Sequence, residues 1–221
     1  MVMVLMNNTI QNIDEDIKWR IGEIAMIKAI ISTLSFSDEK KKISMKYSIP
    51  SLYAVWEGFV INTFSEYIKY INQLEIKYLD LNTNIVIYDS FTTLNLTEPP
   101  KTTFDAKKRF IKKIHHYFNH QIKLSLNIKT NSNVNYATLT SLCHCYGLQM
   151  INNDYEAPLN KFVGIRNKVA HGDNSIVVNI EMIEEFANLI NDLMEELRDY
   201  IQDAIENKRY LENPLNISMD F

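Results

Sequence analysis

The sequence predicts an all-α protein: an antiparallel bundle of four to five main helices, with a long connector between the second and the third. The 221 residues contain only 5 Gly and 5 Pro, so few turns are available and long uninterrupted elements are expected. Apolar residues also recur at alternating spacings of three and four, the period of an amphipathic helix. Neither an internal repeat nor a shift in composition divides the chain, so we expect residues 1–221 to form a single domain.

The first two predicted helices follow one another near the N-terminus. Residues 10–34 carry an apolar stripe that Arg20 interrupts. The second helix is predicted over residues 51–74, and Pro50 just before it suits a helix start because proline has no N–H to satisfy. Residues 78–100 have no helical period and form the predicted connector.

The remaining helices are bounded by glycines and polar caps. Gly147 and Gly172 suit the left-handed position that follows a helix, and Asn179 is a favoured N-cap. The predicted elements are a helix over residues 103–126, a polar loop over 127–135, a shorter helix over 136–147, a helix that starts with Pro158 and ends before Gly172, and a final helix over 179–207. Because the longest of these helices share one period, antiparallel packing is expected.

The cysteines and the N-terminus indicate a reducing compartment. Cys143 and Cys145 are separated by one residue, a spacing that closes no useful disulfide loop. The apolar run at residues 1–6 is shorter than a signal peptide requires, and no run approaches the roughly 20 apolar residues that span a bilayer. We therefore expect a cytoplasmic protein without a membrane partner.

Two segments contain residue types that could bind zinc. His116 and His120 stand four residues apart on a predicted helix, and Cys143, His144 and Cys145 offer further ligands. The Cys-x-Cys spacing lacks the second paired element that structural zinc sites have, however. We predict no metal and no cofactor, and we expect the cysteines to be small buried residues.

The formal net charge of −4 conceals a separation of charge along the chain. Between Lys101 and Lys129, eight Lys or Arg residues stand against Asp105 alone, and over residues 180–221 eleven acidic residues oppose three basic ones. The basic helix, which also carries aromatic rings, is typical of a surface that tracks RNA phosphates, although a solvated face over an ordinary core stripe fits equally well. The predicted RNA-binding residues are Lys107, Lys108, Arg109, Lys112, Lys113 and Lys168.

The sharpest local feature is the segment that ends at Gly172. Arg166 falls on the apolar face of the predicted helix, where a guanidinium needs an acidic or phosphate partner because an unpaired buried charge is costly. His171 follows five residues later, and Asn167 is next to the arginine. A histidine in this place also has an ordinary structural explanation, since it stabilises the last carbonyls of a helix.

Arg166-Asn-Lys-Val-Ala-His171 resembles the Arg-x4-His signature of the HEPN superfamily. Two earlier blocks, Trp19-Arg-Ile-Gly-Glu23 and Leu52-Tyr-Ala-Val-Trp-Glu-Gly-Phe59, are similar to the MAE-type branch, which is related to RiboL-PSP-HEPN proteins. The resemblance implies an all-α bundle that dimerises, and a metal-independent endoribonuclease of the kind found in toxin–antitoxin and antiphage systems. It makes His171 the acid and base, Arg166 the phosphate ligand, and Asn167 the residue that orients either.

Two further expectations concern the assembly of such a site. Residues five apart on one helix point about 140° away from each other, so pairing of two copies across a two-fold axis is a natural way to complete it. Arg20, Glu23 and Glu57 are auxiliary candidates, either as a structural ion pair that fixes helix register or as residues of the cleft.

Three functions remain open from the sequence. The first is RNA cleavage by a HEPN homodimer, acting as a toxin or in an antiphage or stress response, with a cognate antitoxin or another partner protein. The second is a non-catalytic HEPN module that dimerises or binds nucleotide or RNA within a defence or regulatory complex. The third is a helical antitoxin or adaptor whose acidic C-terminal helix mimics nucleic acid.

Overall fold

The structure, a computed structural model, describes residues 2–33, 37–93 and 103–212. Within them the chain forms helices and, apart from two isolated β-bridges, no strand, which confirms the all-α fold class. No helix among the described residues combines the length and apolar character needed to cross a bilayer. The helices are α1 (Val2–Thr33), α2 (Asp38–Asn72), η1 (Tyr78–Asp80), α3 (Thr83–Thr93), α4 (Phe104–Asn119), α5 (Tyr136–Cys145), η2 (Asn153–Tyr155), α6 (Glu156–Ala170) and α7 (Ile180–Glu206).

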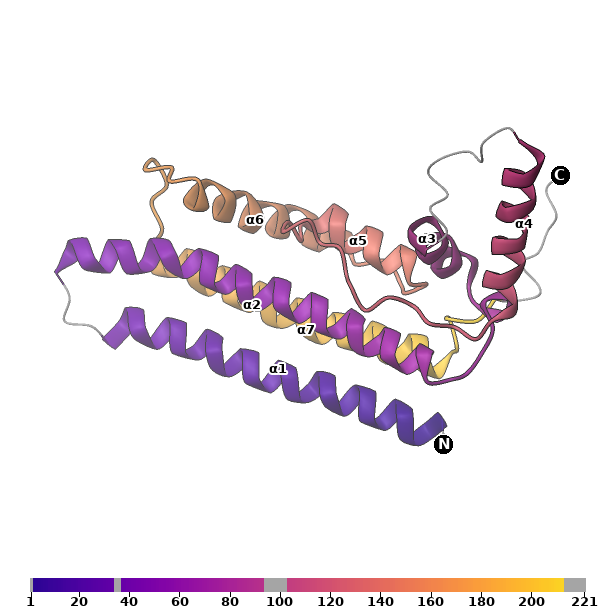
Figure 1. Cartoon of the computed structure of the whole chain (residues 1–221). Coiled ribbons are helices and arrows are strands. Elements are labelled where there is room, and N and C mark those ends of the chain that lie inside the picture. The colour runs from indigo at the N-terminus through magenta and orange to yellow at the C-terminus, as the bar shows by residue number, and fades with distance from the viewer. Residues whose placement is uncertain (1, 34–36, 94–102, 213–221) are drawn as a thin grey trace.

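Four helices form the bundle (Figure 1). α1 and α6 run in one direction, and α2 and α7 run in the other. α2 is central, since it packs against α1, α6 and α7. The rings of Trp56, Phe59 and Phe64 on α2, Phe162 on α6 and Phe186 on α7 are fully buried. Each such ring stabilises the fold by about 1.5–3 kcal/mol because it leaves water.

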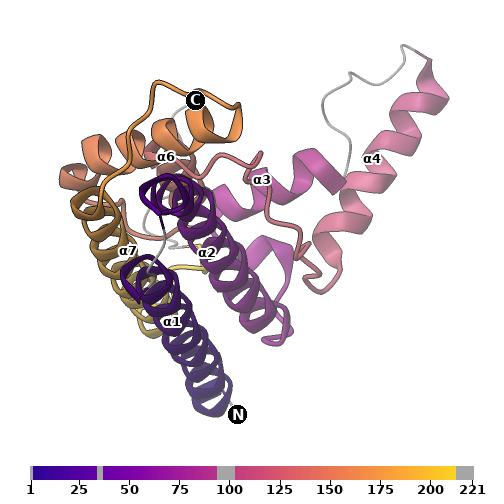
Figure 2. The ribbon, with the colours of Figure 1, turned by 90° about the vertical axis from the view of Figure 1, so that its left-hand side faces the viewer.

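α3 and α4 lie at the end of the bundle where α2 finishes, and α4 stands away from the other helices (Figures 1 and 2). The buried side chain of α4 is Tyr117, whose ring stacks on that of Tyr78 with centroids 4.0 Å apart. Both hydroxyls donate to Oδ2 of the buried Asp89 on α3, at 2.8 Å from Tyr117 and 3.3 Å from Tyr78. Burial and the adjacent carboxylate raise the pKa of Tyr78 to about 12, so this phenol stays a donor at neutral pH.

After α4 the chain returns along α2 in an extended form over residues 120–135, which we call the strap. The side-chain amide of Asn72 binds the backbone of Leu124 in both directions, donating to its carbonyl at 3.0 Å and accepting from its N–H at 2.8 Å. Further along, Ser65 Oγ donates to the carbonyl of Leu126 at 3.2 Å. Side chains of α2 thus satisfy backbone groups that a sheet would otherwise pair.

α2 begins at Asp38, so the predicted start after Pro50 is wrong and that proline lies inside the helix. Proline lacks the N–H that the preceding turn would accept. In the same turn, Ser48 Oγ donates to Met45 O at 2.7 Å. The apolar period does not reveal the first turns, since residues 37–43 are mostly exposed.

The predicted connector is also wrong in part, because it contains η1 and α3. Ile85 and Asp89 are both buried and lie four residues apart, which is a helical spacing. The β-branched run at residues 85–87 obscures this pattern because such residues favour extended chain. Residues 94–100 of the connector lie outside the described residues.

The helix predicted over residues 103–126 ends at Asn119 instead. Ile122 and Leu124 are buried while Gln121 and Lys123 are exposed, and this alternation has the period of an extended chain. The basic segment is therefore divided between a helix and the strap.

The predicted ends of the later helices are confirmed, whereas α6 begins at Glu156, two residues before the predicted start at Pro158. Gly147 and Gly172 follow α5 and α6 with φ values of +69° and +79°, a conformation that favours glycine. Asn179 caps α7, because its side-chain oxygen accepts from the N–H of Met182 at 3.0 Å.

Candidate functional site

The candidate catalytic residues lie on the last turns of α6. The helix ends in a Schellman arrangement, in which the N–H of Asp173 donates to Lys168 O at 2.9 Å. Lys46 of α2 donates from Nζ to Asp173 O at 2.8 Å and so fixes this turn. His171, at the C-cap position, and Lys168 remain exposed to solvent.

Arg166 is half-buried and stacks on an aromatic ring instead of forming an ion pair. Its Cζ lies 3.4 Å from the centroid of the Tyr53 ring on α2, and Nη2 donates to Ser132 O at 2.5 Å. Nε is buried without a hydrogen-bond partner, and no salt bridge to Arg166 is found among the described residues. The sequence predicts an acidic or phosphate partner for Arg166, and among the described residues no acidic side chain forms a salt bridge with it.

Tyr53 links Arg166 to the strap. Its hydroxyl accepts from the N–H of Val134 at 2.8 Å. Burial raises the pKa of Tyr53, while the N–H of Val134 and the charge of Arg166 act in the opposite direction. The neutral ring presents its negative face to the guanidinium, an interaction of about 0.5–2 kcal/mol that depends on the degree of desolvation.

The end of the strap, residues 130–134, forms a loop that α2 and α6 both hold; we call it the site loop. Asn131 and Ser132 have φ values of 52° and 51°, so the backbone is locally strained there. Besides Tyr53 and Arg166, three side-chain contacts fix the loop: Trp56 Nε1 to Val134 O at 3.0 Å, Thr130 Oγ1 to Glu57 Oε1 at 2.6 Å, and Asn167 Nδ2 to Asn133 Oδ1 at 3.4 Å.

The site loop is the part of the site that sequence reasoning missed. The sequence predicts a polar loop at this place but gives no reason to put it against Arg166. The available signal is the run Asn131-Ser-Asn133, since asparagine tolerates the left-handed conformation better than most residues.

Arg20 is buried, but its partners are not the predicted ones. Nε donates to Asp16 Oδ2 at 2.8 Å and Nη1 to Val55 O at 2.7 Å, so the salt bridge involves neither Glu23 nor Glu57. The carbonyl of Val55 on α2 therefore binds the guanidinium of Arg20 on α1. This geometry favours the register-fixing interpretation, with Glu57 instead serving the site loop.

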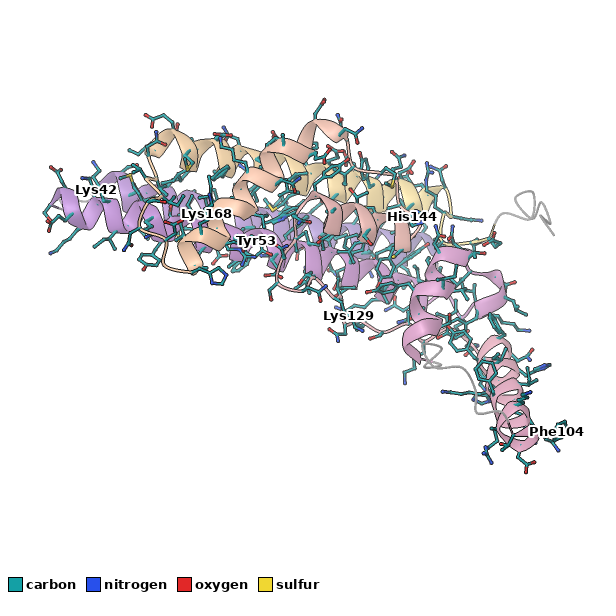
Figure 3. The ribbon with its side chains drawn as sticks, turned by 90° about the horizontal axis from the view of Figure 1, so that it is seen from above. Lys42, Tyr53, Phe104, Lys129, His144 and Lys168 are labelled. Atoms are coloured by element: carbon teal, nitrogen blue, oxygen red, sulfur yellow. The ribbon has the colours of Figure 1, made fainter. Side chains whose placement is uncertain are left out.

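The structure places the basic helix far from Arg166 within one chain. All five predicted RNA-binding residues of α4 are exposed, whereas Lys101 lies outside the described residues. Tyr53 and Lys168 lie toward one end of the molecule, and Phe104, the first residue of α4, lies at the other (Figure 3). From Tyr53 to Asn72 at the end of α2 the helical rise alone amounts to about 28 Å.

The residues considered as zinc ligands from the sequence do not form a metal site in the structure. The rings of His116, on α4, and His120, just after it, lie with their centroids 3.7 Å apart and their planes tilted by 41°. Cys143 is buried on α5, and burial raises the pKa of its thiol to about 12. Within the described ranges no group of three or more His, Cys, Asp or Glu side chains is arranged to hold a metal ion.

The comparisons with known proteins address the family. The family model described as HEPN_MAE_28990-like HEPN matches residues 9–210, a range that contains all three sequence blocks of the resemblance and both Arg166 and His171. No curated protein and no solved structure matches the chain. Since the family model covers far more than half of the 221 residues, the chain belongs to the HEPN_MAE_28990-like HEPN family.

Proposed function

We propose that the protein is a metal-independent endoribonuclease that works in the cytoplasm as a HEPN homodimer. The observation that carries the proposal is Arg166: a guanidinium held on the Tyr53 ring, without a carboxylate partner among the described residues, five residues before the exposed His171. A cation held in this way is suited to an incoming phosphate.

The chemistry uses the 2′-hydroxyl of the RNA as nucleophile. His171 takes the proton of that hydroxyl as its oxygen attacks the adjacent phosphorus, and His171 of the partner subunit gives a proton to the leaving 5′-oxygen. Arg166 stabilises the charge that develops on the phosphorane oxygens, and Asn167 orients Arg166 or His171. The products are a 2′,3′-cyclic phosphate and a free 5′-hydroxyl, so atoms balance without water or metal.

The direction of the side chains supports the proposed dimer. Arg166 faces the site loop, whereas His171 is exposed beyond the end of the helix, so one chain alone leaves the acid and base without a closed cleft. A second copy across a two-fold axis supplies the missing wall. Lys168 borders the cleft, and the exposed lysines of α4 bind more distant parts of the RNA.

The biological role that fits is a toxin or an antiphage or stress-response nuclease, restrained by a cognate antitoxin. Nucleic-acid mimicry by α7 receives less support, because acidic residues of that helix have partners within the chain. Glu185 pairs with Lys161 at 2.8 Å, and Asp203 pairs with Arg209 at 2.6 Å.

The test is incubation of single-stranded RNA with the full chain in excess EDTA. We expect cleavage by the wild type, and at least a roughly hundredfold loss in Arg166→Ala and His171→Ala, the scale of lost acid–base or charge stabilisation. His171→Ala should melt like the wild type because the side chain is exposed. Cleavage that survives both substitutions, or that EDTA abolishes, contradicts the mechanism.

The same experiment separates the second candidate function, a non-catalytic HEPN module that binds RNA or nucleotide. The observation that favours it is the bond from Arg166 Nη2 to Ser132 O, which occupies part of the guanidinium. Wild-type protein that binds RNA and never cuts it, with binding reduced in Arg166→Ala, would establish this alternative.

A further inference from the structure

A pocket opens beside the strap, away from Arg166. The pocket lies between α3, the strap and the residue after α5. Apolar side chains form much of the wall, whereas Asn127 and Lys129 of the strap are exposed polar residues. The lining residues are Ile85, Tyr88, Asp89, Leu124, Ser125, Asn127, Lys129 and Tyr146. An apolar wall with a few polar groups at its edge is typical of a site for a small planar group.

The position of the pocket relates it to the proposed function. The strap joins α4 to the site loop, so its residues lie between the basic helix and Arg166. Lys129 is seen between Tyr53 and Phe104 (Figure 3). A strand of RNA that contacts α4 and reaches Arg166 along the strap therefore passes the mouth of the pocket.

We propose that this pocket binds one unpaired base of single-stranded RNA; the inference rests on the proposed function and adds a second contact with the same substrate. The half-buried ring of Tyr88 lines the pocket and offers a stacking face. The exposed amide of Asn127 has a donor and an acceptor for a base edge.

The charges decide which part of a nucleotide enters. Asp89 in the wall is a buried carboxylate that accepts from the hydroxyls of Tyr78 and Tyr117, so a phosphate inside the pocket is disfavoured. Lys129 is exposed and has no salt bridge within the described residues, which suits the phosphate next to the bound base. The base of the nucleotide therefore occupies the pocket, and the sugar–phosphate backbone of the RNA stays outside it.

The experiment measures binding, so that it does not depend on cleavage. A fluorescent 12-nucleotide 2′-O-methyl RNA, which lacks the nucleophile, is titrated by anisotropy against the full chain and compared with a duplex of the same sequence. We expect Tyr88→Leu, Asn127→Ala and Lys129→Gln each to weaken binding of the single strand roughly five- to tenfold, the order of one lost stacking or phosphate contact. Tyr88→Phe, which keeps the ring, should restore most of the binding lost in Tyr88→Leu, and Lys18→Gln on α1 should bind as the wild type does.

A 4-thiouridine label in the same RNA should crosslink to residues 85–89 or 124–129. Thermal melting guards against misfolding of Tyr88→Leu, and the exposed Asn127 and Lys129 positions give variants that keep the core intact. Wild-type affinity in both of these variants, or equal binding of duplex and single strand, overturns the pocket proposal. Binding that depends on these residues in a protein that never cleaves RNA would overturn the nuclease and support the pocket.

Discussion

At the scale of single residues, the site depends on how one arginine is held. Arg166 has a ring beneath it and one carbonyl beside it, and neither neutralises its charge. Because its Nε is buried without a partner, the side chain has little freedom to relax toward solvent. Tyr53 therefore acts as a positioning residue: it keeps the guanidinium in place and also fixes the site loop through its hydroxyl.

Two substitutions at Tyr53 separate these roles. Tyr53→Phe keeps the ring but leaves the N–H of Val134 unpaired, so we expect a loss of about 1–3 kcal/mol in unfolding free energy with most of the cleavage rate retained. Tyr53→Leu also removes the ring face, so kcat should fall roughly tenfold to a hundredfold further because the phosphate ligand is misplaced. Urea unfolding and RNA cleavage at the same temperature are the measurements. Equal kcat in the two variants would show that the ring does not position Arg166.

At the scale of elements, α1 and α2 are joined through a buried charge. The guanidinium of Arg20 sits against Gly58, where a Cβ would lie 2.9 Å from Nη1 and 3.3 Å from Nη2. Glycine is required here because two helices approach closely around a group already bound to Val55 O and Asp16. The polar contact fixes the register of an otherwise apolar interface.

A matched pair of glycine substitutions tests this contact. Gly22→Ala on α1 meets nothing within 4 Å, so we expect a gain of about 0.5–1 kcal/mol from helix propensity alone. Gly58→Ala has the same propensity gain but displaces Arg20 from a charge-assisted hydrogen bond of about 1.5–3 kcal/mol, so a net loss is expected. Urea unfolding of both variants measures the difference, and equal stabilisation by the two alanines would contradict the role given to Gly58.

At the scale of the whole molecule, the bundle separates the basic helix α4 from the end of α6, and the substrate of the proposed nuclease has to connect these two surfaces. The basic helix stands at one end, and α6 ends toward the other. The strap runs between them along α2, which gives the molecule a continuous face from α4 to the site loop. The substrate of the proposed nuclease is therefore expected to be a strand of several nucleotides.

The proposed shared cleft predicts a dominant-negative effect. If both copies of His171 serve one cleft, a threefold excess of His171→Ala chains leaves about a quarter of the wild-type chains in wild-type dimers after random exchange. The cleavage rate per wild-type chain should fall to about that fraction. An excess of Lys18→Gln chains is the matched control and should not lower the rate. Unchanged activity with the His171→Ala chains would mean that each copy acts alone.

Sequence periodicity located most of the helices and missed α3 and the first turns of α2. α7 was predictable because its buried residues recur at three and four, and so was α1 from Ile10 onward, although α1 begins at Val2, eight residues before its apolar stripe. α3 was not, because its β-branched run has the local character of a strand and tertiary packing overrides that preference. The start of α2 was not predictable either, since most of its first residues face water.

The sequence by itself determined the family motif, the all-α class and the residues with the right chemistry, since these depend on residue types and short spacings. Only the tertiary structure decided their partners. Arg20 binds Asp16 instead of Glu23, and Arg166 faces Tyr53 and Ser132, which are 113 and 34 residues away in the chain. Such contacts arise where helices and the strap pack together, and a local pattern carries no information about packing at that range.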